Sequence, residues 1–345
     1  MSTIHDVAHL AGVSIKTVSR VVNRESGIRP ATLERVTQAI EKLSYRPHRG
    51  ARMMRSAKSG LVGIVTARLS LSGGPNDDIG LSDMHLLRGA HRVCREAGMT
   101  LLMADAAGDP NAVADLLDTF ASHQVEGVIF VAPSHQLVPM LLKSDVPLVL
   151  ANCFDLLGTT SVLPDDALGQ RLAVERLVAL GHRRIGYVGL PETNVAGRLR
   201  KAAFIETCQA QGLSPADCPA LIGATADGPN TFAPLAAALA DLVARPQRPT
   251  ALCLGNDIMA LHAIRCLEQL GLRLPQDMAL IGYDNDSTLC NALRPRLSTI
   301  TLPYEAMGAR AAELLLERLA QPDQPAQTCL VPCEVVLRDS CPALN

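Results

Sequence analysis

The chain has 345 residues, of which 48% are hydrophobic and 19% are charged, so it can bury large cores, and wholesale disorder is excluded. No apolar run reaches the roughly 18 residues that span a bilayer, and the N-terminus lacks the basic and apolar regions of a signal peptide. We therefore expect a cytoplasmic protein, without membrane contact, whose ten scattered cysteines stay reduced.

Charge is distributed unevenly along the chain. Residues 1–59 hold 11 basic and four acidic side chains, a net +7, whereas the remaining residues hold 21 basic and 30 acidic side chains, a net −9. A small basic segment joined to a large acidic body predicts a polyanionic partner for the basic segment.

The basic segment contains three short amphipathic patterns. Apolar residues at helical spacing predict helices over 4–11, over 15–22 and from Pro30 onward. Gly12 supplies a left-handed turn after the first helix, and Ser14 can cap the second. Three helices with a glycine turn between the first two predict a helix-turn-helix domain.

The exposed face of the second helix is expected to carry Ile15, Lys16, Thr17, Ser19 and Arg20. Arginine and lysine can contact guanine edges, an apolar tip can meet a thymine methyl, and hydroxyls suit phosphates. The alternative is an ordinary polar surface helix. The net charge of residues 1–59 favours DNA binding.

From residue 61, short apolar runs alternate with helical patterns. Such alternation is typical of parallel sheets covered by helices on both faces, and the runs fall into two sets, near 61–152 and 184–285. We therefore predict a small all-α helix-turn-helix head followed by an α/β core of two parallel-sheet subdomains. Ligands of such sheets bind beyond the carboxyl ends of the strands, in the cleft between the subdomains.

Two groups of segments carry a resemblance to a known family. IHDVAHLAGVSIKTVSRVVN, RPATLERVTQAIEKLSYRP and ARMMRS at the N-terminus, with LGHRRIGYVG, NDIMALHAI and GLRLPQDMALIGYDN in the core, resemble the lactose/galactose repressor family of bacterial transcription regulators. The resemblance implies a DNA-binding domain over 1–46, a hinge over 47–60, and a periplasmic-binding-protein-like core over 61–345 that binds ligand and dimerises.

The resemblance also implies how the core is divided. The chain would cross between subdomains near residues 161, 291 and 325. Subdomain one would then comprise about 61–160 and 292–324, and subdomain two about 162–290 and 326–345.

For the DNA-binding part, the resemblance assigns a role to each matching position. Ile15, Lys16 and Arg20 would read bases in the major groove. Backbone contacts would come from Ser14, Thr17, Ser19 and Asn23. In the hinge, Met54 stands where the family usually has leucine, and would wedge into the minor groove.

For the core, the resemblance places effector-binding groups at strand ends. The principal candidates are Asn152, Arg200, Asn256 and Asp284, and the weaker ones are Asp83, Phe154, Asp155 and Arg198. Each has a structural alternative: Asn256 can cap the helix that follows it, Asp284 can lie in a turn, and Asp165-Asp166 is interpreted as the N-cap of a helix running to Leu180.

The chemistry of these residues suggests the kind of effector. Arg, Asp and Asn with few aromatic neighbours favour a sugar or sugar acid. A nucleoside, purine or phosphorylated metabolite is the alternative. The segment 68–83 is longer and more polar than the family's turn at this place, and its role stays open.

The function predicted is a ligand-responsive repressor that binds a near-palindromic operator as a homodimer. Motifs for nucleotide, hydrolase or metalloprotease chemistry are missing from the sequence, so we expect no enzyme activity, no cofactor and no metal. A transport-associated binding protein would not need the basic head. The chain has no C-terminal leucine heptads, which favours a dimer over a tetramer. Whether the effector releases DNA or promotes its binding is left open.

Overall fold

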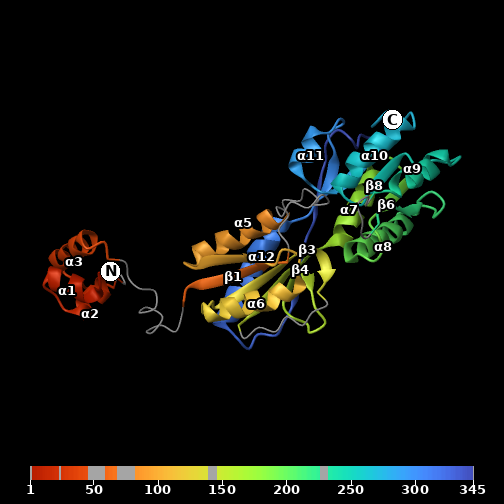
Figure 1. Ribbon diagram of the computed structural model, residues 1–345. Coiled ribbons are helices and arrows are strands. Elements are labelled where there is room, and N and C mark those ends of the chain that lie inside the picture. The colour runs from red at the N-terminus through yellow and green to blue at the C-terminus, as the bar shows by residue number, and fades with distance from the viewer. Residues whose placement is uncertain are drawn as a thin grey trace. The chain divides into compact units, whose positions relative to one another are not determined.

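The computed structural model describes residues 2–22, 25–45, 59–67, 82–138, 146–225 and 232–344. Two compact units divide the chain, Met1–Gly60 and Leu61–Asn345, and we describe each by itself (Figure 1). Among the described residues no helix has the length and apolar character needed to cross a membrane. No cluster of three or more His, Cys, Asp or Glu side chains suited to a metal occurs in the same residues.

The first unit contains the three predicted helices, α1 (Ile4–Ala11), α2 (Ile15–Val22) and α3 (Pro30–Lys42). Gly12 ends α1 in the left-handed conformation at φ 62°, as predicted. The Ser14 hydroxyl accepts a hydrogen bond from the Thr17 amide at 3.2 Å, which caps α2. The helices enclose a small core of buried apolar residues: Val7, Ala8, Ala11, Val18, Val21, Val36, Ala39 and Tyr45.

The second unit contains two six-stranded sheets. The first has the order β11-β5-β4-β3-β1-β2. Its strands are β1 (Leu61–Thr66), β2 (Thr100–Asp105), β3 (Gly127–Leu137), β4 (Leu148–Phe154), β5 (Ser161–Pro164) and β11 (Thr328–Val331). All its pairings are parallel.

The second sheet has the order β12-β10-β9-β8-β6-β7. Its strands are β6 (Ile185–Gly189), β7 (Ala220–Ile222), β8 (Ala251–Leu254), β9 (Ala279–Asp284), β10 (Ser298–Thr301) and β12 (Glu334–Val336). All its pairings are parallel except that of β12, which runs antiparallel to β10. The predicted fold class is confirmed.

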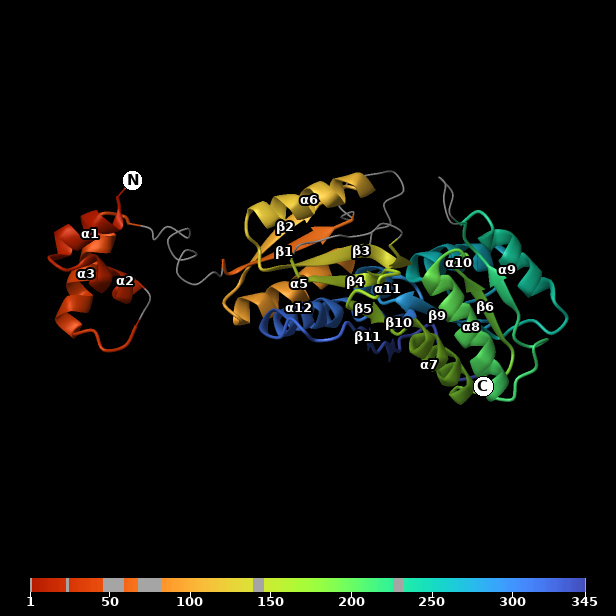
Figure 2. The same cartoon turned by 90° about the horizontal axis from the view of Figure 1, so that it is seen from below.

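Helices cover both faces of each sheet (Figure 2). On the first sheet, α5 (Ser82–Glu96) and α12 (Tyr304–Ala320) pack on one face and α6 (Pro110–Ser122) packs on the other. Successive residues of β3 serve opposite faces: Ile129 packs with α5 and α12, whereas Val128 and Phe130 pack with α6. This period of two, with helices on both faces, explains why residues 127–132 of the strand are apolar.

The second sheet is covered in the same way. One face packs against α7 (Asp166–Ala179) and α8 (Val195–Ala210), and the other against α9 (Leu235–Ala244) and α10 (Asp257–Gln269). The short helix α11 (Ser287–Ala292) follows β9.

The chain crosses between the sheets later than expected. β5 and β11 pair with each other in the first sheet, and β10 belongs to the second sheet beside β9. The crossings therefore lie near residues 165, 303 and 332, and the expected positions 161, 291 and 325 were wrong. The reason is edge pairing: β10 continues the second sheet's parallel ladder, and a local sequence pattern does not reveal which sheet a short strand joins.

Glycines bring α5 and α12 into backbone contact. A Cβ atom built on Gly308 would overlap the carbonyl oxygen of Leu86, and one built on Gly89 would overlap that of Glu305. The two helices make the most extensive contact between any two helices of the described chain. Close packing of backbones therefore depends on these two positions.

Gly308→Ala should lower the free energy of unfolding by about 1–3 kcal/mol, because the added methyl group forces the two helices apart. Alanine has a higher helix propensity than glycine, which by itself would stabilise the variant by roughly 1 kcal/mol. The overlap between the helices is expected to outweigh this gain. Urea denaturation measures the change. The control is Ala306→Gly, at an exposed position of the same helix, which loses only the propensity term. A Gly308→Ala variant as stable as the native protein would contradict the assigned contact.

Candidate functional site

The first candidate site is the surface of α2 in the N-terminal unit. Ile15 is 39% exposed, Lys16 and Ser14 are exposed, and Thr17 is half-buried. Ser19 was expected on this exposed face, and that expectation was wrong, because its side chain lies buried beside Val18. Asn23 and Met54 lie outside the described residues.

Arg20 folds back onto the loop that follows its own helix. Its Nε donates to Glu25 Oε2 at 3.1 Å, and its Nη2 donates to the Ser26 carbonyl at 3.0 Å. The ion pair is partly exposed and therefore weak, on the order of 0–1 kcal/mol. The hydrogen-bond acceptors of a guanine edge can therefore replace these two partners of the Arg20 guanidinium at little cost in free energy.

The second candidate site is a group of polar and charged side chains in the core, most of them buried, at the carboxyl ends of β8 and β9. We call it the Asp166 cluster, and it consists of His135, Asp166, Arg200, Tyr283 and Asp284. Arg200 Nε donates to Asp166 Oδ1 at 2.7 Å, and Arg200 Nη1 donates to the Gly255 carbonyl at 2.7 Å. The Arg200 guanidinium lies over the Tyr283 ring, 3.6 Å from its centroid.

Asp166 joins the two subdomains. Its Oδ1 binds Arg200 of α8, which packs on the second sheet, and its Oδ2 lies 2.7 Å from Nδ1 of His135, which belongs to β3 of the first sheet. β3 loses its regular pairing with β4 between Val131 and Gln136, and His135 lies in this irregular stretch. Local irregularities of this kind re-aim side chains at functional sites.

The acid–base properties of the cluster follow from its burial and its charges. Burial raises the pKa of Asp166, but the Arg200 guanidinium and the hydrogen bond with His135 outweigh it, so the net shift is downward. Burial lowers the pKa of Arg200, and Asp166 with its other neighbours more than reverses this. The pair is therefore a buried salt bridge.

Two tyrosines complete the surroundings. The Tyr283 hydroxyl donates to the Asp166 carbonyl at 3.1 Å. Tyr304, at the start of α12, packs against the hydrophobic cores of both subdomains, just after the chain crosses from β10. The junction of the subdomains is thus built from aromatic rings around one ion pair.

The structure brings three of the four principal candidates together. Arg200 Nη1 lies 4.0 Å from Asp284 Oδ1 and binds the carbonyl of Gly255, the neighbour of Asn256. Asn256 also caps α10, since its Oδ1 accepts from the Met259 amide at 2.7 Å, which confirms the structural alternative. Asn152 is buried at the end of β4 and donates to the Ala132 carbonyl at 3.1 Å.

Two of the predicted effector-binding residues have an uncommon backbone conformation. Asn152 and Asp284 have positive φ angles of 61° and 112°, respectively. Such conformations are uncommon for residues other than glycine and gather at functional sites. Both positions were predicted from the sequence as effector-binding.

The weaker candidates mostly serve local structure. The Asp155 carboxylate accepts from the Leu157 and Thr159 amides at 3.1 and 2.9 Å and so shapes its own loop. Arg198 is exposed and donates to the Glu192 carbonyl at 2.9 Å. The Phe154 ring meets His135 edge-on at 5.9 Å between centroids, next to the cluster. Asp83 is buried near the start of α5.

Sequence reasoning missed three members of the cluster, His135, Asp166 and Tyr283. Asp165 is the N-cap of α7, as its bond from the Leu168 amide shows, but its neighbour Asp166 is the buried acid. The tandem of two acids was a usable signal, because a helix needs only one N-cap. His135, which follows the apolar run of β3, has no comparable signal.

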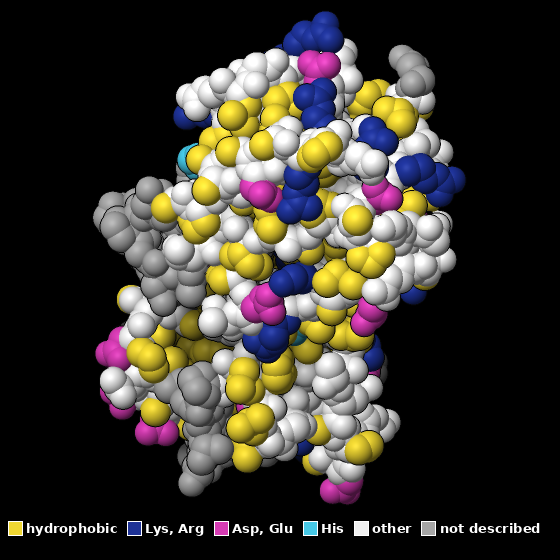
Figure 3. All heavy atoms as spheres, turned by 90° about the vertical axis from the view of Figure 1, so that its right-hand side faces the viewer, with side chains coloured by type: hydrophobic (Ala, Val, Ile, Leu, Met, Phe, Trp, Pro, Cys, Tyr) yellow, Lys and Arg dark blue, Asp and Glu magenta, His cyan; other side chains and the backbone are white. Residues whose placement is uncertain are grey.

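Surface charge on the core is mixed in sign. On the face drawn in Figure 3, basic and acidic side chains lie side by side among hydrophobic ones. This face therefore offers no extended field of one sign, in contrast to the net +7 of residues 1–59. The charge distribution favours the N-terminal unit as the nucleic-acid-binding part.

Comparison with known proteins gives consistent matches over the whole chain. Residues 3–48 match the family of bacterial regulatory proteins of the lacI family, and residues 174–341 match the periplasmic binding protein-like domain. The ribose operon repressor of Escherichia coli (strain K12) is 31% identical over 328 residues, 93% of this chain and 94% of that protein. The repressor PurR of Aliivibrio salmonicida is 31% identical over 99% of both chains. A crystal structure of the lac repressor dimer bound to operator and the anti-inducer ONPF is 26% identical over 99% of both chains, with a TM-score of 0.76.

Proposed function

Because this chain belongs to the lacI family of bacterial regulatory proteins, we propose that effector binding at the Asp166 cluster controls its affinity for operator DNA. The chain is a transcriptional repressor and not an enzyme. The observation that carries the proposal is the Asp166 carboxylate, which is buried and bonded to both subdomains at once. As a regulator of transcription, the protein would act in the cytoplasm and on the nucleoid.

The proposed coupling follows from the two bonds of Asp166. A ligand whose hydroxyls form hydrogen bonds with Arg200 or Asp284 changes the hydrogen bonding around Asp166 and so the strength of its bond with His135. That bond links the subdomains, so the ligand shifts their relative pose. Coupling energies between two such sites typically amount to about 1–3 kcal/mol, a change of roughly 5- to 150-fold in operator affinity.

A neutral, polyhydroxylated sugar is the effector class we propose. The positive charge of the Arg200 guanidinium is already neutralised by the Asp166 carboxylate. Asp284 adds a second carboxylate, 4.0 Å from Arg200. A sugar acid or phosphate would meet these carboxylates, whereas hydroxyl groups can donate to them. The similarity to a ribose operon repressor supports the same class.

A purine or nucleoside is the second candidate. The similarity to the repressor PurR is equally strong, at 31% identity. Phe154 and Tyr304 provide aromatic surface near the cluster on which a flat ring could stack.

We also propose that two copies bind one operator. The lac repressor in the operator-bound crystal structure is a dimer, and this chain is similar to it over nearly its full length. Two copies related by a two-fold axis place two α2 helices in successive major grooves, so the operator would be near-palindromic. Ile15, Lys16 and Arg20 would read bases, Ser14, Thr17 and Asn23 would contact the backbone, and Met54 would enter the minor groove.

A thermal-shift screen of the purified protein tests the effector class. The screen compares neutral sugars, sugar acids, sugar phosphates, nucleosides and purines. At about 100 times its dissociation constant a true effector stabilises the native state by about 2.7 kcal/mol. We expect the hit among neutral sugars, and the same compound should change the affinity for a footprinted operator. A hit among purines would overturn the sugar assignment. A hit that leaves operator affinity unchanged would contradict the proposed coupling.

A further inference from the structure

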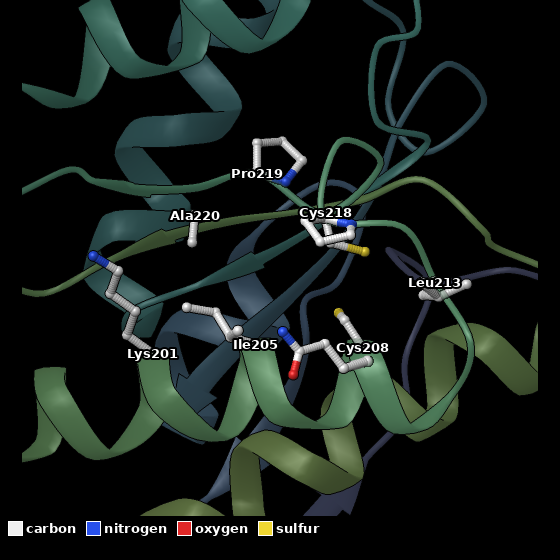
Figure 4. Close-up of a pocket in the computed structure, with 9 residues that line it drawn as sticks. Lys201, Ile205, Cys208, Leu213, Cys218, Pro219 and Ala220 are labelled. Atoms are coloured by element: carbon white, nitrogen blue, oxygen red, sulfur yellow. The ribbon is translucent and has the colours of Figure 1, made fainter.

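A pocket that is separate from the Asp166 cluster lies between α8 and the segment that leads into β7 (Figure 4). Its volume is about 280 Å³, and its wall combines the apolar side chains of Ile205, Leu213 and Pro219 with two cysteines. These are Cys208, near the C-terminal end of α8, and Cys218, directly before β7. The repressor function assigns no role to this pocket.

The two cysteines form a thiol pair. Both are free, and both side chains line the same pocket. Figure 4 shows the two sulfur atoms projecting from opposite walls toward one another. Cys208 is 2% and Cys218 7% exposed, so small molecules would reach them through the pocket rather than from open surface.

The two thiols are chemically unequal. The neighbouring Cys208 thiol lowers the pKa of Cys218; burial opposes this, and the Ile185 backbone assists it. The neighbouring Cys218 thiol, together with burial, raises the pKa of Cys208. The direction of these shifts favours Cys218 as the attacking thiol.

We propose that Cys208 and Cys218 form a redox site, at which a hydroperoxide entering the pocket oxidises the pair to an intramolecular disulfide. In the first step the Cys218 sulfur attacks the terminal peroxide oxygen. The O–O bond breaks, an alcohol (or water) leaves after taking up a proton, and Cys218 becomes a sulfenic acid.

In the second step the Cys208 sulfur attacks the sulfenic sulfur. The S–S bond forms, the S–O bond breaks, and the hydroxyl group leaves as water with the Cys208 proton. The two thiols lose two electrons and two protons, and the hydroperoxide is reduced to the alcohol and one water. The apolar wall of Ile205, Leu213 and Pro219 suits an organic hydroperoxide as well as hydrogen peroxide.

The other cysteines provide an internal comparison. Cys266 and Cys329 are half-buried and more accessible than the pair, but neither lines this pocket. Burial raises the pKa of Cys153 and Cys253, which opposes thiolate formation there. If solvent exposure alone determined which cysteine is oxidised, oxidation would therefore begin at Cys266 or Cys329. If the pairing of two thiols determines it, oxidation would begin at Cys218.

Peptide mapping of the full-length protein tests the proposal. The reduced protein is treated with hydrogen peroxide or cumene hydroperoxide, alkylated, and cleaved on the N-terminal side of aspartate without reduction. This cleavage places Cys208 in peptide 166–216 and Cys218 in peptide 217–226, each as its only cysteine. We expect these two peptides to appear joined, without alkyl label, and to separate after treatment with dithiothreitol.

Single variants distinguish the two steps. Cys208→Ser should stop the reaction at a Cys218 sulfenic acid that dimedone traps, whereas Cys218→Ser should leave Cys208 reduced. Cys266→Ser is the matched control and should still form the disulfide. If Cys208 and Cys218 of the native protein remain fully alkylated while Cys266 or Cys329 is oxidised, the proposal is overturned. This result is independent of whether either variant folds.

Discussion

Replacing Arg200 with alanine should lower the free energy of unfolding by about 3–5 kcal/mol, because Asp166 would remain buried without its cationic partner. The Arg200 side chain is 4% exposed and that of Asp166 is 0% exposed, so water cannot replace the lost charge. The Gly255 carbonyl would also lose its donor. Urea denaturation followed by circular dichroism measures the loss.

The matched control is Arg198→Ala, on the same helix. Arg198 is exposed and binds only carbonyls of the preceding loop, so its loss should cost at most about 1 kcal/mol. Equal stability of the two variants would show that the Arg200–Asp166 bond is not the strong interaction assigned here.

Arg200→Lys separates stability from effector binding. Lysine keeps the charge next to Asp166 but cannot reproduce the planar fork that also reaches Gly255 and faces Asp284. We expect this variant to fold and to bind operator without effector, while its effector affinity falls by about 1.5–3 kcal/mol, roughly tenfold to a hundredfold. Unchanged effector affinity would place the effector site elsewhere.

Replacing Arg20 with alanine should weaken operator binding by about 1–3 kcal/mol and relax specificity at one base pair of each half-site. The Arg20 fork is planar and lies on α2, and its partly exposed partners Glu25 and Ser26 are readily exchanged for a base edge. Fluorescence anisotropy on operators that carry single base changes measures both effects.

Two variants serve as controls for Arg20. Lys42→Ala removes an exposed cation from α3 and should leave base preference unchanged. Glu25→Ala removes the partner of Arg20 and should preserve the specificity that Arg20 provides. Retained discrimination between bases in the Arg20→Ala variant would assign base reading to other residues of α2.

Local patterns were sufficient to predict the N-terminal unit. The predicted helices 4–11 and 15–22 have the same bounds as α1 and α2, and α3 begins at Pro30. Each depends on residues a few positions apart: the apolar stripe of the helix, the left-handed Gly12 and the Ser14 cap. Helix formation is a local process, so these features are visible in the sequence.

Pairings between distant segments decided the rest of the fold and much of the core site. β10 could join either sheet as far as its own residues show, and only its ladder with β9 places it in the second. The bonds that Asp166 makes to His135 and Arg200 span 31 and 34 residues of chain, respectively.

The sequence by itself determined the alternation of strands and helices in the core and the basic character of residues 1–59, which depend on composition and local periodicity. The class of protein and the candidates Asn256, Asp284 and Arg200 followed from the resemblance to a known family, and the structure places Arg200 on α8 rather than at a strand end. Only the tertiary structure decided that Asp166 and not Asp165 is the buried acid, that Asn256 caps a helix, and that Cys208 meets Cys218. The reason is physical: burial and charge pairing are properties of the folded neighbourhood, to which residues far apart in the chain contribute.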